Sequence, residues 1–318
     1  MTIVTGPAYS GYFADPFVLR LPDGRYAAYG TGRPPAPRED GAPAAPVGPR
    51  AFEALESADL VTWEARGLVL ERLPESAGDE YWAPEVAYAD GAYWLYYSVG
   101  HGISGHHVRV ARSEEPFGPF LDCGVSLTPE ERFAIDAHPF QDDDGRWYLF
   151  YARDILDAAR PGTHLAVVEL QDMTTPAGPA TPVLEPHDDW QLYQSGRSMY
   201  GATYEWHTIE GPAVVRRQGR CWMTYSGGAW TGDGYGVTWA VADSPLGPWH
   251  HPADAVPLLD TAGTGLLGPG HNSLVVAPDG SDVVAFHAWD TPDGTRQMYL
   301  RHVDFTPDGP VLGEPLRA

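Results

Sequence analysis

Short aromatic and β-branched runs recur along the chain, and each follows a polar residue and a glycine. Clear examples are YWLYY at 93–97 and WYLFY at 147–151. Such runs are too short and too aromatic to favour a helix, and a polar-Gly pair is typical of a hairpin turn. The pattern predicts buried β-strands entered through tight turns.

The polar-Gly turn occurs five times, at intervals of 67, 54, 74 and 61 residues. Its glycines are Gly24, Gly91, Gly145, Gly219 and Gly280. Each interval fits one four-stranded antiparallel sheet with its loops, and no stretch indicates a long helix. We therefore expect an all-β chain, a single domain over 1–318 that forms a five-bladed β-propeller of four-stranded antiparallel sheets. A β-sandwich is the alternative.

Composition and charge exclude several kinds of partner. The chain has no run of eighteen apolar residues, so we expect no membrane span. A formal net charge of −23 without any basic cluster disfavours nucleic-acid binding. The only cysteines, Cys123 and Cys221, lie outside any metal-ligand spacing, and Met1 to Gly11 lacks the pattern of a secretory signal. These features lead us to expect a cytoplasmic location.

Chemically distinctive residues share one position in the repeat, nine residues before each turn glycine. They are Asp15, Trp82, Asp136, Glu210 and His271. In a propeller the first strand of each blade lines the central channel, so these positions would form one ring. A single Asp could simply cap a backbone amide. Three acids in register, however, place like charges close together, which a functional task would maintain.

Two carboxyl groups that flank a sugar bond are the minimum for glycoside hydrolysis. One is held protonated and donates its proton to the leaving oxygen, while the other is ionised and activates water or attacks carbon. A third carboxylate nearby raises the pKa of the acid through like-charge repulsion. The ring of acids therefore suggests a glycosidase.

The motifs around these positions resemble glycoside hydrolase family 43 over nearly the whole chain. They are Ala14-Asp15-Pro16, Tyr81-Trp82-Ala83-Pro84-Glu85-Val86, Ile135-Asp136-Ala137-His138-Pro139, Ile209-Glu210-Gly211-Pro212 and His271-Asn272-Ser273. The resemblance implies a five-bladed propeller and an inverting mechanism. It also implies that Asp15 is the general base, that Glu210 is the general acid, and that Asp136 orients this acid and raises its pKa. In an inverting enzyme the base and the acid lie about 6.5–9.5 Å apart.

The resemblance also implies contacts with the sugar, and the expected residues are Trp82, Ala83, His138, Trp206, His271 and Arg296. Trp82 would offer an apolar face, with Ala83 beside it in the motif, although Trp82 could equally pack the channel. Arg296 would bind sugar hydroxyls or a catalytic carboxylate, or be an ordinary surface arginine. His138 departs from the family pattern, because many relatives place Pro directly after the Asp, and it could contact substrate.

No cofactor is required for the chemistry, but a cation in the central channel is an expectation of the resemblance. His271 would support a calcium or other cation through water molecules, or would be an imidazole merely hydrogen-bonded in place.

Two segments stand apart from the repeats. Residues 33–50 are rich in Pro, Gly and Ala and are expected to form a flexible surface insertion. Residues 187–207 are expected to form a loop at the rim of the active site, whose aromatic residues, Trp206 among them, stack on sugar or bury the loop's own backbone.

The family resemblance favours an oligosaccharide substrate, with removal of α-L-arabinofuranosyl units from the ends of short plant oligosaccharides as the leading hypothesis. β-D-Xylosidase and endo-arabinanase activities remain open. A non-catalytic sugar-binding propeller and an enzyme that retains configuration or transfers sugars are further alternatives.

Overall fold

The computed structural model describes residues 6–33, 48–253, 255–292 and 294–316, and nearly all of its regular structure is β-strand. The segment 34–47, which makes up most of the predicted surface insertion, lies outside the described residues. Short helical turns form at η1 (Glu75–Ala77), η2 (Asp189–Gln191) and α1 (Thr261–Thr264). None of the described helices is long and apolar enough to cross a membrane.

Three sheets are four-stranded antiparallel meanders in the described part of the chain. The first contains β1 (Ala14–Arg20), β2 (Tyr26–Thr31), β3 (Arg50–Ser57) and β4 (Glu64–Glu71). The second contains β5 (Glu80–Ala89), β6 (Ala92–His101), β7 (Ser104–Ser113) and β8 (Leu121–Ser126). The last contains β18 (Leu267–Val276), β19 (Asp282–Trp289), β20 (Arg296–Thr306) and β21 (Gly309–Pro315).

The remaining strands form one longer sheet. Its first part contains β9 (Ala134–Gln141), β10 (Trp147–Ile155), β11 (Gly162–Asp172), β12 (Thr175–Pro176) and β13 (Thr181–Leu184). Its second part contains β14 (Leu192–Met199), β15 (Ala202–Arg217), β16 (Arg220–Gly227) and β17 (Gly236–Ala242). The two parts join where β11 and β15 pair in parallel through only two residue pairs, Gly162 with His207 and Thr163 with Thr208. Strand pairing of the described residues therefore gives four sheets, and it does not confirm the expected five.

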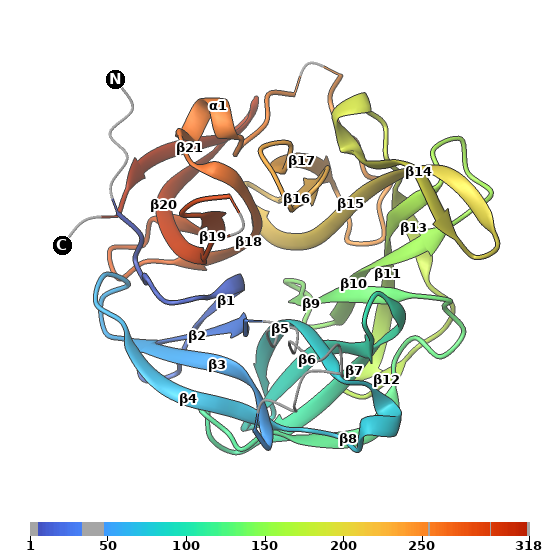
Figure 1. Ribbon diagram of the computed structural model, residues 1–318. Coiled ribbons are helices and arrows are strands. Elements are labelled where there is room, and N and C mark those ends of the chain that lie inside the picture. Colours follow the sequence, from blue (N-terminus) through green and yellow to red (C-terminus); the bar gives the residue numbers. More distant parts are fainter. Residues whose placement is uncertain (1–5, 34–47, 254, 293, 317–318) are drawn as a thin grey trace.

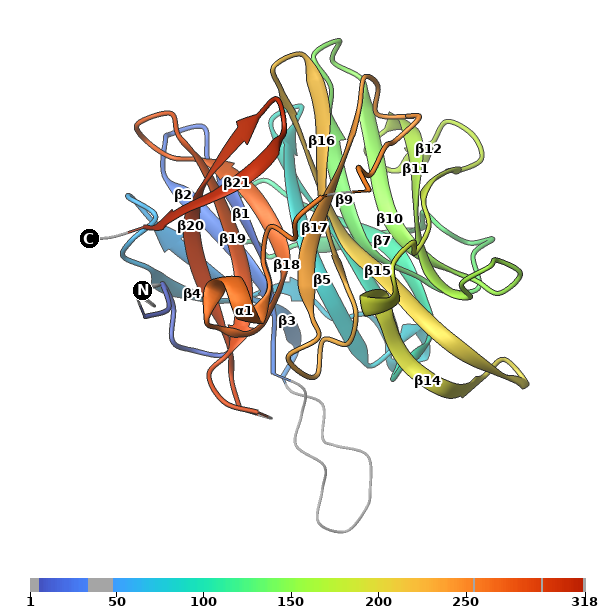
Figure 2. The same cartoon turned by 90° about the horizontal axis from the view of Figure 1, so that it is seen from above.

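The sheets stand around a common centre, as Figure 1 shows from one end and Figure 2 from the side. Strands β1, β5, β9, β15 and β18 lie innermost, and each contacts the next so that they close a ring. This radial arrangement confirms the all-β prediction and differs from the two stacked layers of a sandwich.

Hydrophobic clusters fill the spaces between successive sheets. One cluster, for example, packs Phe17 and Tyr29 of the first sheet against Tyr97 of the second. Other clusters join β5–β8 to β9–β11, β9–β11 to β15–β17, β16–β17 to β19–β21, and the last sheet back to the first. Because most sheets are buried on both faces, their strands read as continuous apolar runs rather than as alternating ones.

The five polar-Gly turns lie where the sequence predicts them, between the innermost strand and its neighbour in each repeat. Their glycines have φ values of 75° to 89°, a conformation that glycine adopts without a steric penalty. The predicted rim loop at 187–207 is wrong as a loop. It contains η2, β14 and the start of β15, and the two strands pair as an antiparallel hairpin.

Candidate active site

Every innermost strand contains a β-bulge at the same place. The register against the neighbouring strand shifts across Ala14 to Phe17 in β1, and equivalent shifts occur in β5, β9, β15 and β18. The first residue of each bulge has a left-handed backbone. These residues are Asp15 (φ 50°), Ala83 (49°), Asp136 (59°), Gly211 (55°) and His271 (48°). Left-handed φ is uncommon outside glycine, so its recurrence here marks one strained feature built into each repeat.

The bulges correct the count of nine residues before each turn glycine. That count finds the bulge residue in three strands, but in β5 and β15 it stops one residue short of Ala83 and Gly211. The reason is the turn, because β5 and β15 end in two-residue turns whereas the other three turns are one residue longer. Trp82 and Glu210 therefore precede the bulge residue, and their side chains start from a different backbone position than that of Asp15.

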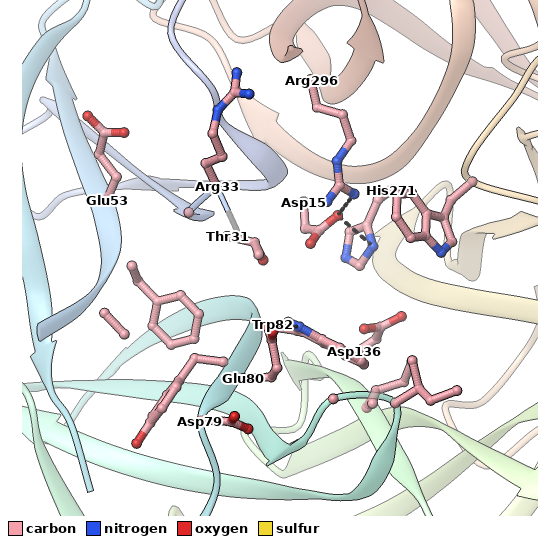
Figure 3. Close-up of a pocket in the computed structure, with 18 of the residues that line it drawn as sticks. Asp15, Thr31, Arg33, Glu53, Asp79, Glu80, Trp82, Asp136, His271 and Arg296 are labelled. Carbon is pink, nitrogen blue, oxygen red and sulfur yellow. Dashed lines mark hydrogen bonds and ion pairs between the residues drawn. The ribbon is translucent and has the colours of Figure 1, made fainter. Parts of the chain in front are cut away.

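The three predicted carboxylates nevertheless line one cavity of about 480 Å³ at the centre of the molecule. Trp82, His271 and Arg296 line the same cavity, and Figure 3 shows these three with Asp15 and Asp136 around one space. Residues from all five innermost strands or their neighbours thus meet there.

Asp15 is surrounded by cationic and ring nitrogen groups. Its Oδ1 lies 3.4 Å from Nη1 of Arg296, 3.5 Å from Nδ1 of His271 and 3.4 Å from Nδ1 of His287. Burial alone would raise the pKa of this carboxyl, but attraction to His271 and Arg296 holds the pKa below its ordinary value. Asp15 is therefore an anion at neutral pH, ready to accept a proton.

The pKa values of Asp136 and Glu210 are raised, in contrast to the pKa of Asp15. Burial raises the pKa of Asp136 to about 7, with the nearby charges of Glu210 and Asp15 adding to the effect and His271 opposing it. Burial also raises the pKa of Glu210, against a hydrogen bond that Tyr235 donates to its Oε1 at 2.7 Å. Carboxyl groups whose pKa is raised in this way keep their proton to higher pH than exposed carboxyl groups do. The cavity thus contains an ionised carboxylate together with carboxyls that can hold a proton.

His271 faces the three carboxylates of the cavity. Burial lowers the pKa of its imidazole, but Asp15, Asp136 and Glu210 raise it more, so the net shift is upward. No group of three or more His, Cys, Asp or Glu in the described part of the chain is arranged to hold a metal. The expected cation at His271 stays a prediction.

Three predicted substrate contacts lie away from the cavity wall. Ala83 is buried, and its amide bonds within the fold. His138 is also buried, with Nδ1 2.6 Å from Oε2 of Glu85. Trp206 is 1% exposed, and the guanidinium of Arg197 covers its ring at 4.8 Å. Their positions do not support direct contact with substrate, because nearness to a motif does not decide where a side chain points.

The sequence reasoning missed several residues that support the site. Tyr235 lies in a glycine-rich stretch without strand periodicity, and its ring stacks on His287 with centroids 5.9 Å apart. Trp230 and Trp289 place their rings 4.8 Å and 5.5 Å from the guanidinium carbon of Arg296. These contacts fix the direction in which Arg296 reaches Asp15. No sequence signal for Tyr235 or Trp230 was available, since both lie outside the repeated turn pattern.

Comparison with known proteins finds a matching family and related proteins over most of the chain. The pattern described as Glycosyl hydrolases family 43 matches residues 4–311. The Beta-D-galactofuranosidase xynD of Aspergillus niger is 30% identical over 96% of this chain and 83% of its own length. The Alpha-L-arabinofuranosidase 43 of Humicola insolens is 31% identical over 74% of this chain, which spans only 47% of that enzyme. The crystal structure of a thermostable family-43 glycoside hydrolase superposes with a TM-score of 0.78 at 29% identity, covering 96% of this chain and 94% of that one.

Proposed function

This chain belongs to glycosyl hydrolases family 43 and acts on O-glycosyl bonds, and we propose that it is an inverting, exo-acting α-L-arabinofuranosidase. One observation carries the proposal: a single cavity holds Asp15 as an anion beside Glu210, whose pKa is raised. An ionised carboxylate and a protonated carboxyl in one cavity are what hydrolysis of a glycoside requires, and the family resemblance supports the inverting form of this reaction.

In the proposed reaction, Asp15 removes a proton from a water molecule while the oxygen of that water attacks the anomeric carbon. Glu210 donates its proton to the glycosidic oxygen as the bond between that oxygen and the anomeric carbon breaks. Asp136 lines the same cavity and senses the charges of both groups, and in its ionised form it would raise the pKa of Glu210 through repulsion. Arg296 and His271 hold Asp15 in place. The products are a sugar of inverted anomeric configuration and the shortened oligosaccharide.

We also propose that the fold is a five-bladed propeller. Five bulged inner strands that close a ring support this count for the described residues, as do the five inter-sheet clusters. On this view the long sheet is two blades, tied by the two-residue parallel contact between β11 and β15.

The test is a panel of 4-nitrophenyl glycosides, with the α-L-arabinofuranoside and the β-D-xyloside foremost, assayed on wild type, Asp15→Asn and Glu210→Gln. We expect hydrolysis of the 4-nitrophenyl arabinofuranoside to fall by orders of magnitude in Asp15→Asn while sugar affinity persists. Glu210→Gln should show a comparable loss on the methyl glycoside, whose alkyl leaving group needs the proton of the acid. A protein that only binds sugar would hydrolyse none of these glycosides. Proton NMR of the first-formed sugar should show inversion, and retained configuration would overturn the single displacement.

A second candidate is β-D-galactofuranoside hydrolysis. The relative with that name matches 96% of this chain, and the furanose ring of β-D-galactofuranose has the same configuration as that of α-L-arabinofuranose, with one more hydroxymethyl carbon on its side chain. A cavity of about 480 Å³ is larger than a single pentose needs, so the added carbon has room. The ratio of kcat/KM for the two 4-nitrophenyl furanosides decides between them.

A further inference from the structure

The bulge residues are tied to a neighbouring sheet through their backbone amides. Four of the five donate to a side chain on the second strand of the preceding sheet. The bonds run from Ala83 to Oγ1 of Thr31 (2.8 Å), from Asp136 to Oγ of Ser98 (3.1 Å), from His271 to Oγ of Ser226 (2.8 Å) and from Asp15 to Nδ1 of His287 (3.0 Å). All four acceptors are buried.

These acceptors occupy one equivalent position. Each faces the residue that comes immediately before the bulge of its own sheet: Thr31 pairs with Ala14, Ser98 with Trp82, Ser226 with Glu210 and His287 with Gly270. The same hydrogen bond therefore occurs in four of the five repeats, with Thr, Ser, Ser and His as the acceptors.

The fifth copy lacks the acceptor. On β10 the equivalent residue, paired with Ile135, is Ala152, which is fully buried and has no polar side-chain atom. The amide that it would hold belongs to Gly211. That amide donates instead to Oδ2 of Asp136, at 3.0 Å. A catalytic-site carboxylate thus stands where the other sheets use a hydroxyl or an imidazole.

We propose that Asp136 completes this ring of hydrogen bonds because Ala152 leaves the amide of Gly211 without a partner, and that this tie holds its carboxylate beside Glu210. Ala152 is then a positioning residue, which acts by offering no competing acceptor. The inference rests on the proposed function, since it takes Asp136 to be the group that tunes Glu210. An unpaired buried amide is costly, so a bond to Asp136 is strongly favoured.

The tie has an electrostatic consequence. The amide of Gly211 favours the ionised form of Asp136 and lowers the pKa of that carboxyl against the effect of burial. Without the tie, Asp136 would hold its proton more tightly and repel Glu210 less. The pKa of Glu210 would then fall, and the alkaline limb of kcat/KM against pH would move to lower pH.

Ala152→Ser tests the proposal, because Ser98 and Ser226 show that a serine at this position reaches the next bulge amide. The new hydroxyl should take the amide of Gly211 and release Asp136. We expect kcat to fall about tenfold with little change in KM, and the alkaline limb to move to lower pH. Ala152→Cys is the matched control, since its thiol has a similar shape but is a weak acceptor, and it should keep the wild-type profile.

A second pair of variants covers the case in which Ala152→Ser does not fold. Ser98→Ala removes the acceptor for the amide of Asp136 itself, so kcat and the alkaline limb should shift in the same directions. Ser98→Thr should keep the wild-type kcat and the wild-type alkaline limb, because Thr31 fills the equivalent position in the first sheet.

The outcomes separate the two proposals when Asp136→Asn is measured alongside. If Asp136→Asn loses activity while Ala152→Ser behaves like Ala152→Cys, or while folded Ser98→Ala keeps the wild-type profile, the ring proposal is wrong and the proposed function stands. A fully active Asp136→Asn would overturn the role of Asp136 and the ring proposal, whereas a fully active Asp15→Asn would overturn the proposed function.

Discussion

Tyr235→Phe removes the tyrosine hydroxyl that donates a hydrogen bond to Glu210, the candidate acid, and leaves the aromatic ring in place. The hydroxyl donates to Oε1 of Glu210 at 2.7 Å, and Tyr235 is 1% exposed. The aromatic ring stacks on His287, a contact that phenylalanine retains. The variant therefore changes the hydrogen bonding of Glu210 more than it changes the packing around it.

The direction of the effect follows from the donor. A phenol that donates to a carboxylate favours its ionised form, so this bond lowers the pKa of Glu210 against the larger, opposite effect of burial. A hydrogen bond to a charged group contributes about 1.5–3 kcal/mol, and one pKa unit corresponds to about 1.4 kcal/mol. Because the protonated acid keeps part of the bond, we expect the pKa of Glu210 to rise by about one unit in the variant.

The assay is kcat/KM against pH, measured on the methyl glycoside of the sugar that the panel identifies. An alkyl leaving group needs the proton of Glu210, whereas 4-nitrophenolate leaves without it and would hide the effect. The alkaline limb should move to higher pH by about one unit. Tyr96→Phe is the control, because its buried hydroxyl donates to the carbonyl of Met173, away from the cavity.

An alkaline limb that stays in place, or that moves to lower pH, would refute this reasoning if Tyr96→Phe keeps the wild-type profile. Glu210 would then not be the group that titrates on that limb, or Tyr235 would not favour its ionised form.

Further predictions concern the other supports of the site. Arg296→Met removes a cation that lowers the pKa of Asp15, so the acidic limb of kcat/KM should move to higher pH; an unchanged limb would contradict this. Gly270→Ala places a Cβ 2.1 Å from Cε1 of Tyr235, and we expect urea unfolding to show a loss of about 1–3 kcal/mol, whereas a wild-type midpoint would argue against this packing. Dialysis against EDTA should leave kcat/KM unchanged, because the described residues contain no group of three or more His, Cys, Asp or Glu placed to hold a metal ion; a loss that calcium restores would show that a cation is needed.

Local sequence was enough to predict the repeated hairpins. A polar-Gly pair before an aromatic run specifies a turn and a buried strand from neighbouring residues alone, and all five turns lie where this pattern places them. It was not enough to align the bulges. Asp90-Gly91 and Gln218-Gly219 form turns one residue shorter than the others, and only backbone pairing shows that Ala83 and Gly211 are the true equivalents of Asp15.

The sequence by itself determined that acidic residues recur at nearly the same distance before the turns of three repeats, and so predicted which carboxylates would share one cavity. Only the tertiary structure decided their surroundings. Asp15 is held anionic by Arg296 and His271, and Glu210 is buried beside Tyr235, through contacts between residues far apart in the chain. A pKa depends on burial and on nearby charge, and neither is encoded in local spacing. For the same reason the sequence placed His138 at the substrate, whereas packing turned it toward Glu85.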